Sequence, residues 1–235
     1  MQALIFDCDG VLVDTERDGH RVAFNEAFQK HGLDVEWDVE QYAELLKVGG
    51  GKERMRHYFD QNGYPEEVDD QEAFIKALHM DKTEIFMDLI KTGKLPVRPG
   101  IKRIIDEALG EAIQVMICST SNVKAVTAIA ETLVGMDRKK RMKGIFAGDM
   151  AKKKKPDPEI YNLAKTTLDL DPKQCLVIED SRNGLLAAKA AGMHCLVTLS
   201  TYTVHEDLKE ADKIVPDLEN DGDPLSLKDL KNLIA

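Results

Sequence analysis

The chain has 235 residues, of which 43% are hydrophobic and 31% charged, a composition typical of a globular protein with a sizeable buried core. Its 32 Lys and Arg against 42 Asp and Glu give a formal net charge of −10, which argues against binding nucleic acid or an anionic membrane through overall charge. The four cysteines lie in or beside apolar runs without paired spacing, so we expect buried free thiols and a reducing compartment. No apolar run approaches the roughly 18 residues of a membrane span.

An unbroken apolar run at 3–6 ends in an acidic, glycine-containing stretch and predicts a buried strand followed by a loop. Similar runs recur in the second half of the chain, where helix-like patterns of apolar residues separate them. Strands that alternate with helices predict an α/β fold with a parallel sheet. The predicted strands lie at 3–6, 114–118, 145–146, 175–178, 194–197 and 213–215.

The long stretch between the first two predicted strands has apolar residues at helical spacing, such as Phe24, Ala27 and Phe28, and no convincing strand. We therefore expect an all-helical insertion. The segment at 95–100 contains two prolines and a glycine and resists both helix and sheet, which marks it as a domain boundary. The expected domains are a core at 1–14 and 98–235 and a helical domain at 15–97.

Polar side chains follow four of the predicted strands. In an open parallel sheet the carboxyl ends of the strands meet at one edge, where ligands bind. One acidic strand end is typical of a solvated loop, whereas four polar strand ends at one edge predict a site. These side chains are Asp7 and Asp9 after the first strand, Ser119, Thr120, Ser121 and Asn122 after the second, Asp149 and the lysines at 152–155 after the third, and Glu179 and Asp180 after the fourth.

The carboxylates of Asp7, Asp9, Glu179 and Asp180 would repel one another if they met without a counter-charge, so the arrangement predicts a bound cation. Carboxylate oxygens favour a hard ion, and Mg²⁺ is the common choice where a phosphate completes the ligand shell. The hydroxyl groups of Ser119 and Thr120 precede a predicted helix that begins at Asn122. Together with the first backbone N–H groups of that helix, these hydroxyls form an anion cradle. A phosphoryl group fits both halves of the predicted site.

Asp7 and Asp9 are two residues apart, so one carboxylate can attack phosphorus while the other exchanges a proton with the leaving or attacking oxygen. A lysine beside them would hold the nucleophile and the phosphate oxygens together as charge moves. These residue types at this spacing predict phosphoryl transfer by nucleophilic catalysis.

Four motifs follow one another along the chain: Asp7-Cys8-Asp9-Gly10-Val11, then Ser119, then Lys155-Pro156-Asp157-Pro158, then Glu179-Asp180-Ser181 with Gly184. In this order they resemble the four motifs of the haloacid dehalogenase superfamily, and the resemblance covers nearly the whole chain. It implies a Rossmann-like core, a helical cap inserted after the first strand, and an aspartyl-phosphate intermediate.

The resemblance also implies a role for each motif residue. Asp7 would be the nucleophile and Asp9 the general acid and base. Ser119 would bind phosphate, and Lys155 would balance the charge. The implied ligands of Mg²⁺ are the Asp7 carboxylate, the Asp9 backbone carbonyl, Asp180 and, directly or from a second layer, Glu179.

The chain also contains Asp14-Thr15-Glu16, Lys-Val-Gly-Gly-Gly-Lys-Glu-Arg at 47–54, and Ile-Cys-Ser-Thr-Ser-Asn at 117–122. With the lysine run before Pro156, these segments resemble the CbbY-type sugar phosphatases. Members of that group from photosynthetic organisms hydrolyse xylulose 1,5-bisphosphate, an inhibitor of Rubisco. The resemblance implies a small phosphorylated sugar as the substrate. We expect a monomer in the cytoplasm, or in the plastid stroma if a transit peptide has been removed.

Residues 49–52 of the helical insertion, Gly-Gly-Gly-Lys, offer backbone donors and a cation in a loop before a helix. We expect Gly50, Gly51 and Lys52 to bind a second phosphate of the substrate, since a cap must face the core. The alternative is a flexible linker with a solvated lysine. Arg54, two residues further on, is a candidate for the same kind of contact.

Three more residues of the insertion are candidate substrate ligands. Glu16 and His20 are one helical turn apart and share a face just after the catalytic loop, so we expect Glu16 to bind a sugar hydroxyl. His20 is either a second ligand or a packing residue. Lys82, which we place on the helix face opposite Ile85 and Leu89, is either a substrate contact or an ordinary exposed lysine. The expected ligands in the core are Ser119, Thr120, Ser121 and Asn122.

Several other functions are alternatives to a phosphatase. A sugar phosphomutase of the β-phosphoglucomutase type has the same motifs but returns the phosphoryl group to a second sugar hydroxyl instead of to water. A binding protein without catalysis is disfavoured, because each catalytic position holds the expected residue type. A dehalogenase or phosphonatase is also disfavoured, because relatives of those kinds lack the second aspartate that Asp9 supplies here.

Overall fold

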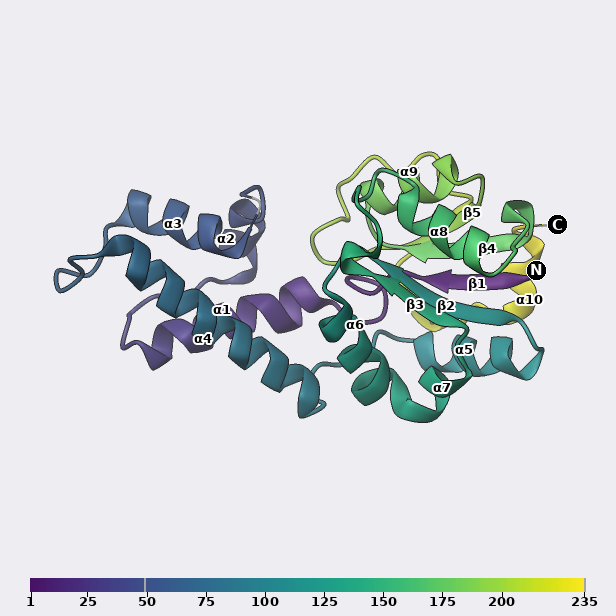
Figure 1. Ribbon diagram of the computed structural model, residues 1–235. Helices are drawn as coiled ribbons and strands as arrows, with labels where there is room; N and C mark the ends of the chain where they lie inside the picture. The colour runs from purple at the N-terminus through teal and green to yellow at the C-terminus, as the bar shows by residue number, and fades with distance from the viewer. Residues whose placement is uncertain (49, 235) are drawn as a thin grey trace. The chain divides into compact units, whose positions relative to one another are not determined.

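The structure is a computed structural model that describes residues 1–48 and 50–234, except for the side chain of Asp149. The chain divides into two compact units (Figure 1), which are described separately. The sheet unit comprises Met1–Thr15 and Gly93–Ala235, and the helical unit comprises Glu16–Thr92.

The sheet unit is an α/β fold built on one parallel six-stranded sheet. Each predicted strand is confirmed, in some cases one residue longer at an end. The spatial order is β3-β2-β1-β4-β5-β6, so the chain winds outward in both directions from β1. The strands are β1 (Ala3–Phe6), β2 (Gln114–Ser119), β3 (Gly144–Ala147), β4 (Cys175–Glu179), β5 (His194–Thr198) and β6 (Lys213–Val215).

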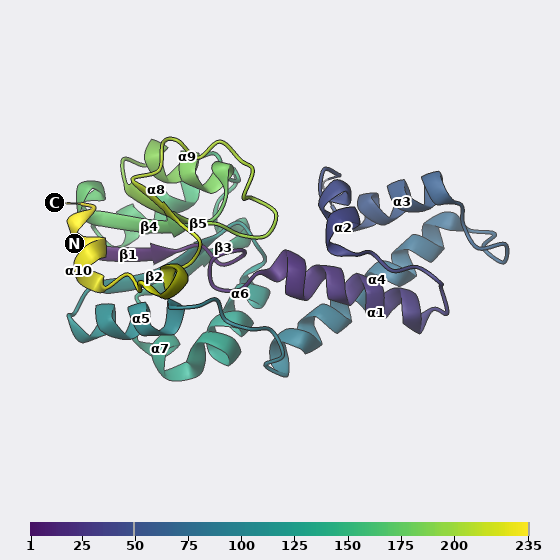
Figure 2. The ribbon, with the colours of Figure 1, turned by 180° about the vertical axis from the view of Figure 1, so that it is seen from behind.

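Helices cover both faces of this sheet (Figures 1 and 2), with α8 and α9 on one face and α5, α6 and α7 on the other. The central strands β1 and β4 are therefore buried along their whole length, which explains why they are unbroken apolar runs. All four cysteines are buried and free, as predicted.

The α-helices of the sheet unit are α5 (Ile101–Gly110), α6 (Val123–Ile129), α7 (Met136–Arg141), α8 (Glu159–Thr167), α9 (Arg182–Ala190) and α10 (Leu227–Asn232). The other helical segments are η2 (Ala130–Gly135), η3 (Gly148–Met150), η4 (Pro172–Gln174) and η5 (Asn220–Gly222).

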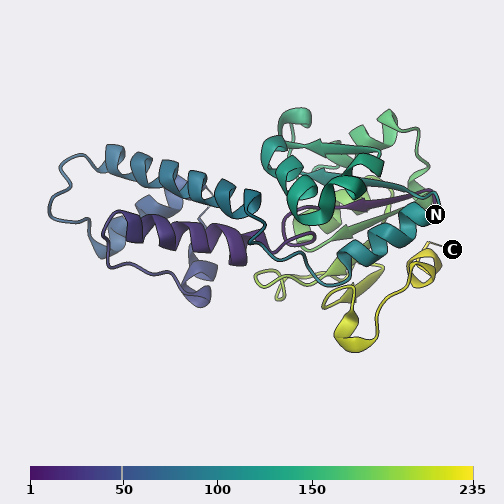
Figure 3. The ribbon, with the colours of Figure 1, turned by 90° about the horizontal axis from the view of Figure 1, so that it is seen from below.

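The helical unit contains no strand over its described residues, in agreement with the apolar spacing of the sequence. Two of its helices, α1 and α4, lie side by side (Figure 3). Asp38 and Asp70 cap α2 and α4 by accepting from backbone N–H groups of the first turns, which fixes where these helices begin. The elements are η1 (Thr15–His20), α1 (Arg21–Lys30), α2 (Val39–Leu45), α3 (Gly51–Asn62) and α4 (Gln71–Lys91).

Aromatic side chains form the core of the helical unit. The ring of Trp37 lies 4.8 Å from those of both Phe24 and Phe28, and all three side chains are fully buried. Aromatic pairs at this spacing add to the stabilisation that burial provides.

In the described part of the chain, no helix is both long enough and apolar enough to cross a membrane.

Candidate active site

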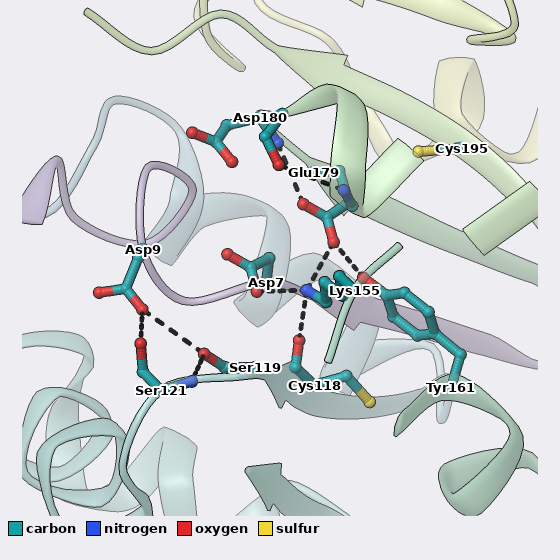
Figure 4. A network of polar contacts seen from close by, with 12 residues as sticks. Asp7, Asp9, Cys118, Ser119, Ser121, Lys155, Tyr161, Glu179, Asp180 and Cys195 are labelled. Carbon is teal, nitrogen blue, oxygen red and sulfur yellow. Dashed lines mark hydrogen bonds and ion pairs between the residues drawn. The ribbon is translucent and has the colours of Figure 1, made fainter. Parts of the chain in front are cut away.

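Three buried carboxylates meet where β1 and β4 end (Figure 4). Asp7, Glu179 and Asp180 each offer an oxygen, and these oxygens all lie within 4.8 Å of one another. The strand register brings these carboxylates together, because Phe6 pairs with Ile178 and the residue that follows each of them, Asp7 or Glu179, is acidic. The backbone N–H of Asp7 also donates to the carbonyl of Ile178, at 3.0 Å.

Two glycines make room for these carboxylates. Gly10 has a positive φ of +79°, and a Cβ atom there would lie 1.9 Å from an oxygen of Asp180. A Cβ atom at Gly184 would lie 2.0 Å from the carboxylate of Glu179. The glycines of the first and fourth motifs are therefore required by the packing of the acidic group.

Lys155 places one ammonium group between two of the carboxylates. Its Nζ donates to Asp7 Oδ1 at 2.5 Å, to Glu179 Oε1 at 2.6 Å and to the Cys118 carbonyl at 3.1 Å. Tyr161, which the sequence did not indicate as a site residue, donates from its hydroxyl to Glu179, and its ring centroid lies 5.0 Å from the Nζ of Lys155. Tyr161 is a buried position of the amphipathic helix α8, and an apolar pattern does not distinguish it from a core residue.

The electrostatics of this group favour an additional cation. Burial raises the pKa of Asp7 to about 7, against the opposing effect of Lys155, and Glu179 and Asp9 raise it further. Burial, Asp7 and Glu179 also raise the pKa of Asp180 well above its ordinary value. Burial opposes the charged form of Lys155, but Asp7 and Glu179 raise its pKa above the ordinary value.

When all three carboxylates are ionised, the one ammonium group of Lys155 leaves two negative charges in a buried space. An oxygen-only set of this kind fits a hard divalent ion, so these residues can hold a metal. The metal role predicted for Asp9 concerns its backbone carbonyl, and its carboxylate is not part of this group.

The carboxylate of Asp9 is held by hydroxyl groups instead. It accepts from Thr15 Oγ1 at 2.6 Å, from Ser121 Oγ, and from Ser119 Oγ at 3.5 Å. Figure 4 shows it pointing toward the two serines and away from Asp180. Asp7 and Asp9 are therefore in different surroundings, one against an ammonium group and the other against hydroxyls, which suits different chemical roles.

The segment after β2 has the predicted form of an anion cradle. Ser119 is buried, and its hydroxyl accepts from the backbone N–H of Ser121 at 3.1 Å. Asn122 caps α6 by accepting from the backbone N–H of Lys124 at 2.9 Å. Thr120 and Asn122 line a hollow of about 610 Å³ in the sheet unit, next to Lys124.

The helical unit brings Glu16 and Arg54 together through Tyr42. The Tyr42 hydroxyl donates to Glu16 at 2.7 Å and accepts from Arg54 at 2.8 Å. The buried guanidinium of Arg54 also donates to the carbonyls of Leu45 and Val48. Arg54 thus holds the turn between α2 and the glycine loop, a function that the sequence pattern does not indicate.

The glycine loop itself is described from Gly50 onward, so the prediction for Gly49 lies outside the described residues. Gly50 has a φ of +92° and precedes α3. A Cβ atom at Gly51 would lie 2.9 Å from the ring of His79. Lys52 is exposed in the first turn of α3, so its ammonium group is accessible to a solute.

The placement of Lys82 opposite Leu89 is wrong. Lys82 is buried on the same face of α4 as Leu78, Phe86 and Leu89. Residues seven apart differ by only about 20° around a helix, so Lys82 and Leu89 must share a face. The Nζ of Lys82 lies 4.7 Å from the ring centroid of Phe24 and 5.3 Å from that of Phe86, and aromatic rings at these distances stabilise a cation.

Lys82 also contacts His20. Its Nζ lies 2.8 Å from His20 Nδ1, and the pKa of His20 is well below its ordinary value, because of burial and of the charges on Lys82 and Arg54. His20 is therefore neutral and accepts from Lys82. Burial, assisted by Arg54 and opposed by Glu16, lowers the pKa of Lys82 to about 8. The helical unit thus holds a buried cation whose hydrogen-bond partner is neutral.

A sheet-edge group of carboxylates with one lysine and an anion cradle suits an enzyme that works on phosphoryl groups. The model of the haloacid dehalogenase-like hydrolase family matches residues 1–192, and the chain belongs to this family. CBBY-like protein from Arabidopsis thaliana is 55% identical over 226 residues, which cover 94% of this chain and 70% of that protein.

Two further relatives are also CbbY proteins. Protein CbbY from Cereibacter sphaeroides is 40% identical over 216 residues, which cover 92% of this chain and 91% of that protein. A variant of CbbY from Rhodobacter sphaeroides, crystallised with xylulose 1,5-bisphosphate, has a TM-score of 0.74 to this chain at 39% identity, covering 92% of this chain and 94% of that one. Within its family the chain is CbbY-like, and it is a phosphatase.

The buried lysine of the helical unit predicts a pH dependence of stability. Folding lowers the pKa of Lys82 from 10.5 to about 8, so between these values the unfolded chain holds more protons there, and stability rises with pH. From pH 8 to 10.5 the free energy of unfolding should rise by up to about 3 kcal/mol more in the parent than in Lys82→Met.

Urea titrations followed by the fluorescence of Trp37, the single tryptophan, would measure this difference. Lys76→Met removes an exposed lysine of the same helix and should show the pH dependence of the parent. Parallel pH profiles for the parent and Lys82→Met would contradict the burial of a titrating ammonium group.

Proposed function

We propose that this phosphatase depends on Mg²⁺ and hydrolyses xylulose 1,5-bisphosphate to xylulose 5-phosphate through an aspartyl-phosphate on Asp7. The observation that carries the proposal is the position of Lys155, which contacts both Asp7 and Glu179. This contact keeps Asp7 in one orientation and offsets part of the repulsion between its carboxylate and an incoming phosphate. The crystallised complex of the related CbbY supports the choice of sugar.

Asp7 and Asp9 divide the reaction between them. An oxygen of Asp7 attacks phosphorus, the ester P–O bond breaks, and the sugar oxygen leaves with a proton from Asp9. Asp9 then accepts a proton from water as the water oxygen attacks phosphorus, which releases inorganic phosphate and restores Asp7. The hydroxyls around Asp9 support this role because they hold its carboxylate away from the acidic group.

Asp7, Asp180 and the backbone carbonyl of Asp9 are the groups that would hold Mg²⁺, with Glu179 next to them. When bound, the ion would neutralise charge on the carboxylates and on the phosphate. Ser119, Thr120, Ser121 and Asn122 would bind the oxygens of the transferred phosphate. The buried Oγ of Ser119 and the cap of α6 support that assignment.

A second phosphate of the substrate would be bound by the helical unit. Lys82 has His20, a neutral group, as its hydrogen-bond partner, and Arg54 lies close enough to lower its pKa. An anion near these cations would relieve their mutual repulsion. Gly50, Gly51 and the exposed Lys52 would contribute further donors, and Glu16 would accept from a sugar hydroxyl.

The proposed compartment is the cytoplasm or, after removal of a transit peptide, the plastid stroma. Four buried free cysteines suit either reducing environment.

The first test is phosphate release from xylulose 1,5-bisphosphate, with and without Mg²⁺, compared with fructose and ribulose bisphosphates and β-glucose 1-phosphate. We expect rapid, Mg²⁺-dependent release from the xylulose ester. Asp7→Asn should lower kcat by at least about 10³-fold, because the amide is a poor nucleophile.

Conversion of β-glucose 1-phosphate to the 6-phosphate with no phosphate released from any ester would show a mutase instead. Release from another bisphosphate alone would keep the reaction type but change the substrate. Full activity of Asp7→Asn would exclude the proposed intermediate.

A second test concerns the helical unit. Lys52→Met should raise KM for the bisphosphate about tenfold, because a charge-assisted contact to the second phosphate is lost. KM for a sugar monophosphate should change less than twofold. Lys76→Met is the matched control for loss of an exposed lysine. Equal effects on both substrates would place Lys52 outside the second-phosphate site.

A further inference from the structure

Arg98 lies in the proline-containing segment that the sequence marks as a boundary, and it belongs to the sheet unit. Its backbone N–H donates to the carbonyl of Leu12 at 2.9 Å, next to a bridge between Val13 and Val97. The two chain segments that connect the sheet unit to residues 16–92 are thus joined to each other at this point.

The guanidinium of Arg98 reaches three other parts of the sheet unit. It donates to the carbonyl of Gly10, to Leu199 at 2.6 Å and to Pro216 at 2.9 Å, with longer contacts to the carbonyl and hydroxyl of Thr198 at 3.4 and 3.3 Å. All five acceptors are neutral oxygens. A planar fork of donors can satisfy several carbonyls at once, whereas the single ammonium of a lysine cannot reach them in the same geometry.

The segments joined by Arg98 are those that surround the acidic group. Gly10 follows Asp9 directly, and its Cα faces the carboxylate of Asp180 so closely that a Cβ atom would overlap it. The Thr198 hydroxyl donates to the backbone carbonyl of Glu179 at 3.4 Å. Displacement of either segment would therefore alter the spacing of the carboxylates.

We propose that Arg98 is a positioning residue for the acidic group. By joining the Gly10 carbonyl to the ends of β5 and β6, it fixes the turn after Asp9 against Asp180 and so keeps the carboxylates close enough to share a cation. This inference rests on the proposed use of Asp7 and Asp180 as cation ligands.

The test measures Mn²⁺ binding to the purified full chain from the electron paramagnetic resonance signal of free Mn²⁺. Arg98→Met and Arg98→Lys should both weaken Mn²⁺ binding about tenfold or more, as is typical when a residue that orients metal ligands is lost. Both should lower kcat at saturating metal with less than a threefold change in KM for the sugar phosphate. If Arg98→Met is not recovered in folded form, Mn²⁺ binding by Arg98→Lys tests the inference.

Thr201→Val is the matched control. It removes a 2.6 Å hydrogen bond to Asp14, which ties the segment after β5 to the same connecting region without contacting Gly10. It should bind Mn²⁺ within twofold of the parent. Folded Arg98 variants that bind Mn²⁺ like the parent, with a lower melting temperature alone, would overturn the inference. A parent that binds no Mn²⁺ would instead contradict the proposed function.

Discussion

The structure depends on how one buried edge of a sheet holds three carboxylates. Asp7, Glu179 and Asp180 lie within 4.8 Å of one another, where mutual repulsion and burial both oppose ionisation. Lys155 offsets part of this cost through two short ion pairs. Buried charges of this kind are a poor source of stability and are typical of functional sites.

The remaining features of the sheet unit follow from this constraint. Central parallel strands bring the two acidic strand ends side by side, and glycines at 10 and 184 leave space for the carboxylates. Tyr161 and Arg98 act from outside the group, one on Glu179 and the other on the turn after Asp9. The helical unit holds its own buried cation, Lys82, against a neutral histidine. The acidic group of the sheet unit is thus short of positive charge, a deficit that a bound cation would offset.

The sequence predicted the strands and the motif residues because each depends on local information. An apolar run followed by an acidic residue is typical of a buried strand that ends at a site, and β1 and β4 both have this form. Tyr161 and Arg98 escaped prediction because their partners are 18 to 118 residues away in the chain. Lys82 was misplaced because a charged side chain was assumed to face solvent, although the helical period assigns it to the buried face.

The proposed mechanism requires that Asp7, held by Lys155, becomes phosphorylated during turnover. Acid quenching during turnover, followed by reduction with borohydride and peptide mapping, would measure this directly, because borohydride converts an acyl phosphate of aspartate to homoserine. We expect homoserine at position 7 and unmodified aspartate at position 9. Modification at position 9, or none at either position in an enzyme that releases phosphate under the same conditions, would contradict the proposed mechanism.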